Sequence, residues 1–391
     1  MLKGKTVAPL TLGCKVNQYE TDGMIELLKE AGMTAVSFEE KADVYLINTC
    51  SVTNMADKKS RQMIHRAKKL NPDAVVIAAG CYVQAAKDKL MEDDRISIII
   101  GNNKKKDIVQ ILEDYLEIGV TDEGMLDIAA EKEYEPLTIN STLEHTRAYV
   151  KIQDGCNQFC SYCIIPYVRG RIRSRELASI TEEVERLAQT GVKEIVLTGI
   201  HISSYGKDKE NEVGLADVID AISKIESIER IRLGSLEPGI ITDTFIDRIV
   251  DNKKVCPHFH LSLQSGCNTV LKRMNRKYTC EEYFEKCEIL RKAFDRPALT
   301  TDVIVGFPGE TDEEFQETVD YLTKLNLYEM HIFKFSPRQG TVAAGMRDQI
   351  GPEIKNQRSD VLLALSEKNK HAYEASFRGE TLEVQIGRAH V

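Results

Sequence analysis

Short apolar runs of strand length alternate with helical segments along almost the whole chain, and this alternation limits the fold more than any other feature. In the first 135 residues these runs are Thr6–Leu12, Val44–Ile47, Ala74–Ala79 and Ile96–Ile100. Apolar residues at helical spacing follow the first run and stop at Gly32, a typical helix end. Strands that alternate with helices pair in parallel, because each helix carries the chain back across the sheet. The sequence therefore predicts a parallel α/β sheet here.

A second alternating series starts near Arg147. Two helices between its strands begin with capping boxes, one at Ser179–Glu182, ending near Gly191, and one at Thr311–Glu314. Six strand–helix units predict a partial (β/α)6 barrel, because eight would close a full one. The predicted strands are Ala148–Gln153, Glu194–Thr198, Arg230–Ser235, His258–Leu263, Thr300–Val305 and Glu329–Phe335.

The length of 391 residues corresponds to two or three domains at roughly 150 residues each. The stretch from about 120 to 146 is acidic and weakly periodic, as in a linker or irregular connection. We predict a sheet domain over 1–135, a linker over 136–146 and a barrel over 147–375. Residues 376–391 would begin a third unit, because Thr381–Ile386 alternates like a first strand.

The composition, with 29% charged and 42% hydrophobic residues, is that of a globular protein and excludes a disordered chain. No run reaches about 18 apolar residues, and Met1–Lys5 lacks the apolar region of a secretory signal. We therefore expect a cytoplasmic protein without a membrane partner. Thiols stay reduced in the cytosol, so the ten cysteines need a role other than disulfides.

Three cysteines form a compact Cys-x3-Cys-x2-Cys motif, Cys156, Cys160 and Cys163, directly after the first barrel strand. Three thiolates on one loop can hold three irons of a [4Fe–4S] cluster and leave the fourth iron open. The loop would lie at the carboxyl ends of the barrel strands, where barrel enzymes keep their active sites. Zinc and unligated thiols are the alternatives, although zinc sites are usually built from paired Cys-x2-Cys halves and no second half exists.

Three further cysteines are far apart in the sequence, but each directly follows a predicted strand: Cys14, Cys50 and Cys81. The carboxyl ends of parallel strands share one edge of a sheet, where ligands bind. The three thiols could therefore converge on a second metal cluster, or they could be small buried residues at strand ends. Cys256, Cys267, Cys280 and Cys287 show no ligand spacing.

Together the two triads resemble the methylthiotransferase branch of the radical S-adenosylmethionine (SAM) superfamily over about residues 1–375. Cys-x3-Cys-x-aromatic-Cys, with Tyr162 before the last cysteine, is the superfamily signature. The settings Gly-Cys-Lys-Val-Asn, Asn-Thr-Cys-Ser-Val-Thr and Ala-Gly-Cys of the other triad are typical of this branch. The resemblance implies a Rossmann-like first domain and a radical SAM barrel.

Within the branch, the chain is most similar to enzymes that act on threonylcarbamoyladenosine in tRNA. The similar segments are Gly13–Asn17, Cys163–Gly170 and Leu263–Cys267. Relatives that modify isopentenyladenosine typically read Gly-Cys-Gln-Met-Asn in the first segment, and relatives that modify a ribosomal protein aspartate differ there too. Both stay open as alternatives, as does a metal-stabilised nucleic-acid-binding module without catalysis.

The resemblance implies insertion of a methylthio group at C2 of the modified adenosine at position 37, beside the anticodon. The compact triad would hold the cluster that cleaves SAM to a radical, and the dispersed triad would hold the cluster that supplies sulfur. A second SAM would provide the methyl group. The implied partners are the tRNA anticodon loop and a reductant protein such as flavodoxin or ferredoxin. The cofactors are two [4Fe–4S] clusters and SAM.

Further candidates for cofactor contacts lie at the ends of the barrel strands. The run Ile304–Glu310 resembles the adenine-binding segment of the superfamily, although a plain tight turn is its alternative. Glu237 could equally be a solvated acid. The candidates are Thr198, Gly199, Ser235, Glu237, Gln264, Ser265, Asp302, Gly306 and Glu310.

Two cationic patches could bind RNA phosphates despite the net charge of −9. Solvated surface is the alternative for both. The family normally continues into a small β-barrel of the TRAM type, and Phe377–Val384 resembles its opening strand. The chain stops soon after, so we expect a truncated TRAM segment. The cations are Arg169, Arg171, Arg173, Arg175, Lys272, Arg273, Arg276 and Lys277.

Overall fold

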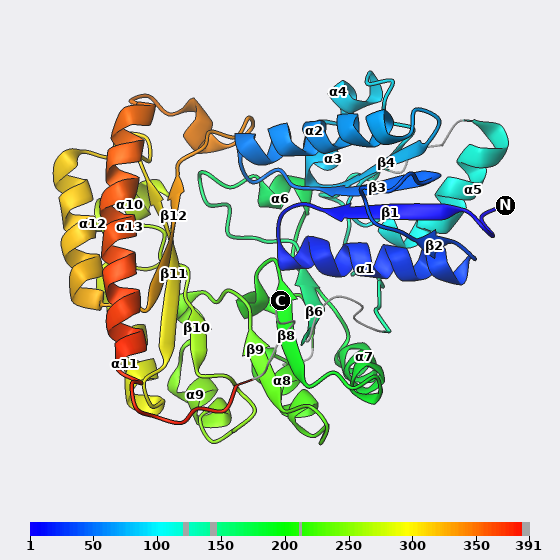
Figure 1. Cartoon of the computed structure of the whole chain (residues 1–391). Coiled ribbons are helices and arrows are strands. Elements are labelled where there is room, and N and C mark those ends of the chain that lie inside the picture. The colour runs from blue at the N-terminus through cyan, green and yellow to red at the C-terminus, as the bar shows by residue number, and fades with distance from the viewer. Residues whose placement is uncertain (120–124, 141–146, 211–212, 385–391) are drawn as a thin grey trace.

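The computed structural model describes residues 1–119, 125–140, 147–210 and 213–384. Its N-terminal part is a five-stranded parallel sheet in the order β2-β1-β3-β4-β5 (Figure 1). The central strands are almost wholly buried and apolar, which is typical of a parallel sheet covered on both faces. The strands are β1 (Thr6–Thr11), β2 (Thr34–Ala35), β3 (Val44–Thr49), β4 (Val75–Gly80) and β5 (Ile98–Ile100).

Helices cover both faces of this sheet. On one face α1 (Lys15–Glu30) and α5 (Ile108–Ile118) pack their apolar sides onto the strands. On the other face lie α2 (Asn54–Leu70), α3 (Cys81–Ala85) and α4 (Lys87–Met91). The 3-10 turn η1 (Lys105–Asp107) leads into α5. The predicted parallel α/β sheet is confirmed, and the short edge strand β2 was not predicted.

The second part is an open barrel of six parallel strands. The strands β6, β8 and β9 form one sheet, with β7 antiparallel at its edge, and β10, β11 and β12 form another. Bridges from Ile231 to Val255 and from Leu236 to Leu261 connect β9 with β10. The strands are β6 (Arg147–Asp154), β7 (Arg173–Ser174), β8 (Glu194–Gly199), β9 (Arg230–Leu233), β10 (His258–His260), β11 (Ala298–Val305) and β12 (Glu329–Lys334).

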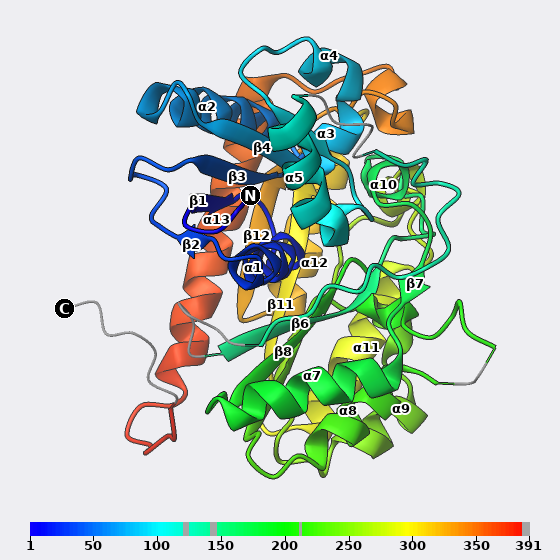
Figure 2. The same ribbon diagram turned by 90° about the vertical axis from the view of Figure 1, so that its right-hand side faces the viewer.

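The barrel helices pack on the outer, apolar face of the strands (Figures 1 and 2). The longest of them, α13, covers β12 and was not predicted. The helices are α6 (Ile165–Val168), α7 (Leu177–Gln189), α8 (Leu215–Ser223), α9 (Asp243–Ile249), α10 (Asn268–Arg273), α11 (Cys280–Ala293), α12 (Asp312–Leu325) and α13 (Pro352–Ala375), with 3-10 turns η2 (Ile202–Ser204), η3 (Pro238–Ile240) and η4 (Val342–Gly345).

The predicted partial barrel is confirmed, while several local predictions differ from the structure. The capping box at Thr311 and Glu314 is present. The box at Ser179 is wrong, because α7 already begins at Leu177 and the Ser179 hydroxyl accepts from Arg175 instead. Residues 381–384 form no strand, and the end of the predicted segment lies outside the described residues. The boundaries at residues 135, 146 and 375 stay predictions.

The irregular connection between the two parts packs tightly over residues 125–140. Leu137 and Ile139 belong to the barrel core, together with Tyr19 of α1. The Tyr19 hydroxyl donates to the Leu137 carbonyl oxygen at 2.6 Å and lies 3.0 Å from Glu183 Oε1 on α7. Helix α1 therefore belongs to the sheet domain by sequence and to both cores by packing.

Five fully buried charged residues connect the two parts. Glu20 of α1 pairs with Lys105 of η1 at 2.9 Å, with Lys151 of β6 at 2.7 Å and with Arg169 at 2.7 Å. Asp154 pairs with Lys151 at 2.5 Å and with Arg169 at 3.1 Å. Burial alone would raise the pKa of Glu20, but the three cations hold that pKa well below its usual value. The carboxylate is therefore ionised, and we call these five residues the ion network.

None of the described helices is both long and apolar enough to cross a membrane.

Replacing Lys105 with methionine should destabilise the protein by about 3–5 kcal/mol, because it removes one partner of a fully buried carboxylate. Urea denaturation followed by circular dichroism measures the change. The matched control is Arg66→Met, which removes the exposed Arg66–Glu39 pair and should cost less than about 1 kcal/mol. Equal effects of the two substitutions would contradict a structural role for the ion network.

Candidate active site

The dispersed cysteines meet at one edge of the N-terminal sheet. Cys14 precedes α1 directly after β1, Cys50 follows β3, and Cys81 begins α3 directly after β4. Gly13 has a φ of +106°, and a Cβ at this position would lie only 2.9 Å from the Cys50 sulfur. The loops of Cys14 and Cys50 are thus in van der Waals contact, and only glycine permits this approach.

The ion network reaches this triad through Arg169. Its Nε lies 3.3 Å from the Cys81 sulfur, and its NH2 donates to Asn17 Oδ1 at 2.7 Å. Asn17 in turn donates to the carbonyl oxygens of Leu12, which follows β1, and of Thr49, which ends β3. The network holds three cations against two carboxylates, so positive charge is in excess beside the thiols. That excess complements an anionic thiolate-ligated cluster.

The compact triad lies in the loop that follows β6. Gly155, with a φ of +70°, allows the chain to turn against Arg171, whose carbonyl oxygen would lie 1.7 Å from an added Cβ. Hydrogen bonds then close the loop: Cys156 N donates to the Gly170 carbonyl oxygen at 3.0 Å, and Cys163 N donates to that of Cys160 at 3.0 Å. The three cysteines are therefore held on one short, fixed loop.

A second buried arginine, Arg276, contacts a sulfur of this triad, as Arg169 contacts a sulfur of the dispersed triad. Arg276 NH1 lies 3.1 Å from the Cys160 sulfur, and its NH2 pairs with Glu237 Oε1 at 2.5 Å. His201 Nε2 lies 3.5 Å from the same carboxylate oxygen. Despite its burial, Glu237 has a lowered pKa because of His201 and Arg276. Glu237 thus anchors the arginine that contacts a cluster sulfur.

The two triads lie on adjacent loops. The Cys81 side chain packs against Ile164 and Val168, and Ile164 directly follows Cys163. Three sulfurs on each side are a soft donor set, which suits iron–sulfur clusters. Burial raises the pKa of Cys50 and of Cys156 to about 11 and that of Cys163 to about 12. These thiols stay protonated at neutral pH until a metal displaces the protons, and the residues fit two clusters.

The predicted cofactor contacts divide into two groups. Thr198 and Gly199 end β8, Ser235 follows β9, and Gln264 has a φ of +77° at the end of the loop after β10, beside Asp302. These residues and Glu237 remain candidates at the carboxyl ends of the strands.

Three other predicted contacts stay predictions, although protein groups enclose their side chains or their turn. Ser265 is fully buried, with its hydroxyl 3.4 Å from that of Thr318 under α12. Gly306 is covered by Lys355 of α13. Glu310 accepts from the Gly306 amide at 2.7 Å and pairs with Arg358 at 2.7 Å, so it closes its own turn. The direction in which such side chains point cannot be predicted from a turn motif.

The RNA contacts predicted for the arginine run need correction. Arg169, Arg173 and Arg175 are at most 3% exposed and are bound to protein groups, so they cannot reach phosphates. In the second patch, Arg273 pairs with Glu314 and Arg276 with Glu237. The cations that stay exposed are Arg171, Lys272 and Lys277.

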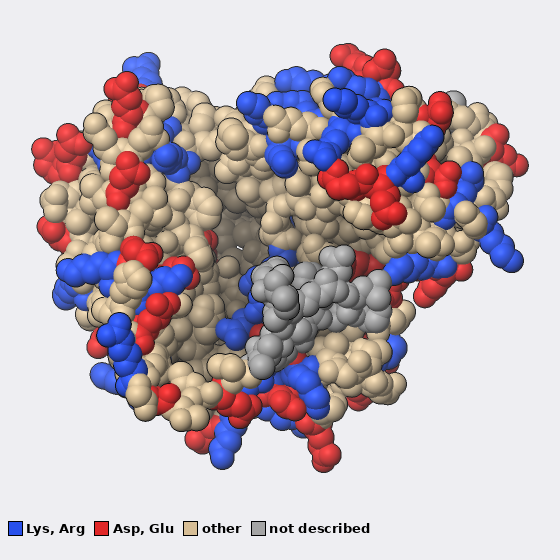
Figure 3. Space-filling model, in the orientation of Figure 1, with Lys and Arg blue, Asp and Glu red and all other residues tan. Residues whose placement is uncertain are grey.

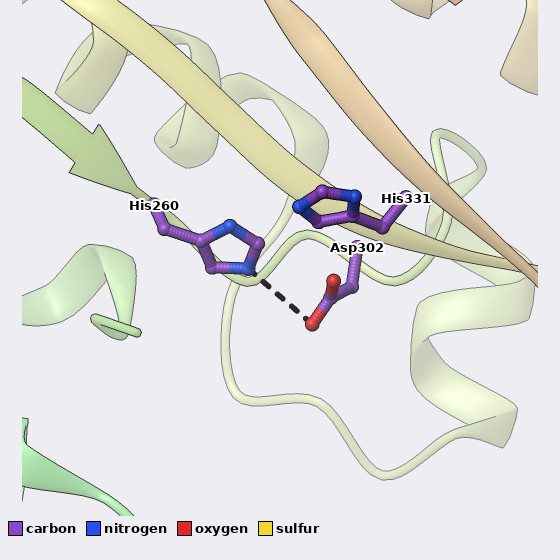
Figure 4. Close-up of side chains that lie close together, drawn as sticks. All are labelled: His260, Asp302 and His331. Atoms are coloured by element: carbon purple, nitrogen blue, oxygen red, sulfur yellow. Dashed lines mark ion pairs between the residues drawn. The ribbon is translucent and has the colours of Figure 1, made fainter. Parts of the chain in front are cut away.

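The barrel opens into a hollow between the β12–α13 side and the N-terminal sheet (Figure 3). Three side chains from β10, β11 and β12 lie close together: His260 Nε2 lies 3.3 Å from Asp302 Oδ2, and the His331 ring stacks on that of His260 (Figure 4). Their ligand atoms lie within 4.8 Å of one another, which suits a divalent cation. The histidines were not predicted, although the alternation His-Phe-His on β10 signals them.

Two family models match the chain: "Radical SAM superfamily" over residues 150–322 and "Uncharacterized protein family UPF0004" over residues 6–101. A relative from Bacillus subtilis (strain 168), threonylcarbamoyladenosine tRNA methylthiotransferase MtaB, is 44% identical over 97% of this chain and 84% of its own length. The namesake from Aquifex aeolicus (strain VF5) is 40% identical over 97% of this chain and 92% of its own length. This chain belongs to the radical SAM methylthiotransferases. It is therefore a transferase that uses SAM and [4Fe–4S] clusters.

Another relative of this methylthiotransferase has a different named substrate. The tRNA-2-methylthio-N(6)-dimethylallyladenosine synthase of Thermoanaerobacter pseudethanolicus is 38% identical over 96% of this chain and 81% of its own length. Among solved structures, the radical SAM methyltransferase TsrM from Kitasatospora setae superimposes with a TM-score of 0.65 at 15% identity, over 87% of this chain and 74% of that one. The latter similarity bears on the fold alone, and it confirms the predicted class.

In the cluster-free methylthiotransferase, the rate of alkylation of Cys163 by iodoacetamide should still rise between about pH 9 and about pH 10 in the folded state. The thiolate is the reactive form, and burial raises the pKa of this thiol to about 12. In urea the alkylation rate of the same cysteine should level off above the ordinary thiol pKa of about 8.5. Mass spectrometry of the Cys163 peptide measures both rates, and coincident pH profiles would contradict the effect of burial.

Proposed function

We propose that this enzyme inserts a methylthio group at C2 of threonylcarbamoyladenosine at position 37 of tRNA, beside the anticodon. The observation that carries the proposal is the contact of Cys81 with Ile164, which brings the two triads together on adjacent loops. Radical formation and sulfur transfer at one carbon require two cofactors that face one substrate. Two relatives that cover most of the chain carry this activity in their names.

We assign the radical-generating cluster to Cys156, Cys160 and Cys163, and the sulfur-supplying cluster to Cys14, Cys50 and Cys81. When bound, the first cluster and SAM supply a radical that abstracts a hydrogen atom, and the second supplies sulfur. Neither assignment leaves a fourth protein ligand, so each cluster keeps one open iron for SAM or for sulfur.

The protein's own contribution is position and electrostatics. Arg276 and Arg169 each donate toward one ligand sulfur, at 3.1 and 3.3 Å. Hydrogen bonds to ligand sulfurs and nearby positive charge stabilise a reduced, more negative cluster. Both arginines are anchored by buried carboxylates, which fixes their distance to the sulfur. Of the ligands of the second cluster, Cys50 and Cys81 are buried, whereas Cys14 is exposed.

The anticodon loop presents single-stranded bases that can be inserted into a pocket. We propose that adenosine 37 enters the hollow of Figure 3 and that the exposed cations Arg171, Lys272 and Lys277 contact phosphates around it. Electrons would come from a flavodoxin- or ferredoxin-type reductant, and a tRNA substrate implies a cytoplasmic enzyme. Isopentenyladenosine is the second candidate substrate, because a synthase of that type is 38% identical.

Serine at Cys14, Cys50 and Cys81 together should leave roughly four irons per chain after anaerobic reconstitution, against roughly eight in the parent. This variant should still cleave SAM to deoxyadenosine with dithionite but should add no methylthio group. Serine at Cys156, Cys160 and Cys163 should abolish deoxyadenosine formation. Cys256→Ser, outside both triads, is the control and should match the parent. Full iron content in either triple variant would show that the ligands are assigned wrongly.

Anticodon stem-loops that carry threonylcarbamoyladenosine or isopentenyladenosine separate the two substrate candidates. The reconstituted enzyme should form the methylthio product from the first at least about tenfold faster, as a polar binding site that would be left unpaired disfavours the apolar analogue. Mass spectrometry of nucleosides measures both products. Preference for isopentenyladenosine would overturn the proposed substrate.

A further inference from the structure

The barrel strands present a charged face to the hollow. Along β11 the residues Leu299, Val303 and Val305 belong to the apolar core beneath the helices. Successive side chains of a strand point to opposite faces, so Asp302 and Thr300 face the other way, into the hollow. The same alternation places Arg232 of β9 and His258 of β10 on the hollow side, opposite the core residues Leu233 and Phe259.

Two arginines on this face share a single carboxylate. Arg232 Nε lies 2.9 Å from Glu194 Oε1, and Arg147 NH1 lies 3.6 Å from the same oxygen. Both remain partly accessible, with 26% and 41% of their side chains exposed, whereas Glu194 is 6% exposed. One anion therefore faces two permanent cations, and their unused N–H donors are open to the hollow.

A third cation comes from the other part of the molecule. Lys15 begins α1 directly after Cys14, and α1 packs against β6 and β8. Because β6 begins with Arg147 and β8 pairs with the strand of Arg232, this packing brings Lys15 to the part of the barrel that carries both arginines. Within the described part of the chain, Lys15 has no ion pair with a carboxylate. Lys15, Arg147 and Arg232 thus carry three positive charges, which face the single negative charge of Glu194. We call these three cations the cation floor.

The other charged groups around the floor are already neutralised by partners outside it. Arg230 pairs with Glu383 at 2.9 Å, and Glu329 pairs with Lys370 at 3.0 Å. Asp302 lies against His260. The excess of positive charge is therefore confined to the floor, and it would attract an anionic group.

One histidine nitrogen beside the floor lacks a hydrogen-bond partner although it is buried: His258 Nδ1. Burial and the charge of Arg232 lower the pKa of His258 to about 4, so its ring is neutral at physiological pH. A neutral imidazole offers one donor and one acceptor. Polar atoms buried without partners are costly, which points to a ligand with its own donors and acceptors here.

Strand register gives the depth of this site. Arg232 lies two residues before Gly234 and three before Ser235, where the cofactor candidates begin. At roughly 3.3 Å per residue, the Cα atom of Arg232 lies roughly 7–10 Å below the carboxyl end of its strand. Arg147 and Glu194, the first residues of β6 and β8, lie deeper in the barrel. An adenine with C2 turned toward the cluster loops would direct its N6 substituent down toward the floor.

Resting on the proposed function, we propose that Lys15, Arg147 and Arg232 bind the carboxylate of the threonylcarbamoyl group and so select this nucleoside. The unpaired Nδ1 of His258 binds its hydroxyl or carbamoyl group. An isopentenyl group offers neither charge nor hydrogen bonds, and it would leave the cation floor desolvated and unpaired. The site therefore explains a preference for an anionic N6 substituent by charge alone.

The test compares two anticodon stem-loops with the reconstituted enzyme: one with threonylcarbamoyladenosine and one with its threoninamide analogue, which is neutral and almost isosteric. The wild-type kcat/KM for the acid should exceed that for the amide at least about tenfold, as expected for hydrogen bonds to a charged group. Equal values would overturn the inference and leave the proposed function intact. Conversion of neither RNA, with conversion of an isopentenyladenosine stem-loop, would overturn the proposed function itself.

Arg232→Gln should remove most of this preference by lowering kcat/KM for the acid and not for the amide. Its matched control is Arg248→Gln, which lies on the outer helix α9 and pairs with Asp217 and Asp220, and it should keep the wild-type ratio. Iron content and deoxyadenosine formation report whether both variants are folded. An unchanged acid-to-amide ratio in folded Arg232→Gln would contradict a role of the floor.

Discussion

The buried ion pairs and hydrogen bonds of Arg169 connect the sheet domain to the barrel and to the N-terminal triad. Its guanidinium is fully buried where the sheet domain meets the barrel, and it contacts Glu20 from one part, Asp154 from the other and the Cys81 sulfur. A buried cation is tolerated only with close anionic partners, so these groups must assemble together or not at all. This requirement couples the packing of the two parts to the geometry of the N-terminal triad.

The second triad repeats the same arrangement with other residues. Arg276 contacts Cys160 and is anchored by Glu237, which His201 also approaches. Each triad thus has one buried arginine whose charge opposes the thiolates and whose position a carboxylate fixes. Because the charge is preorganised, it need not be rearranged when an electron arrives.

The two faces of the barrel strands differ in polarity and therefore in function. The outer face is apolar and packs beneath the helices, which gives the strands a rigid position. The inner face, by strand alternation, carries Arg232, His258, His260 and Asp302. The net charge of −9 therefore hides a local excess of positive charge where an anionic nucleoside substituent would bind.

The parallel sheet, the six barrel strands and the two triads of cysteines could be predicted from the amino-acid sequence, because strand–helix alternation and the placement of cysteines after strands are local patterns. It could not decide which charged side chains are exposed. Arg169, Arg173 and Arg175 look like an RNA-binding run, yet tertiary packing buries them, while Arg232 and Glu194, distant in the chain, pair with each other. A charge pairs with whatever the fold brings near it, and only the tertiary structure decides that.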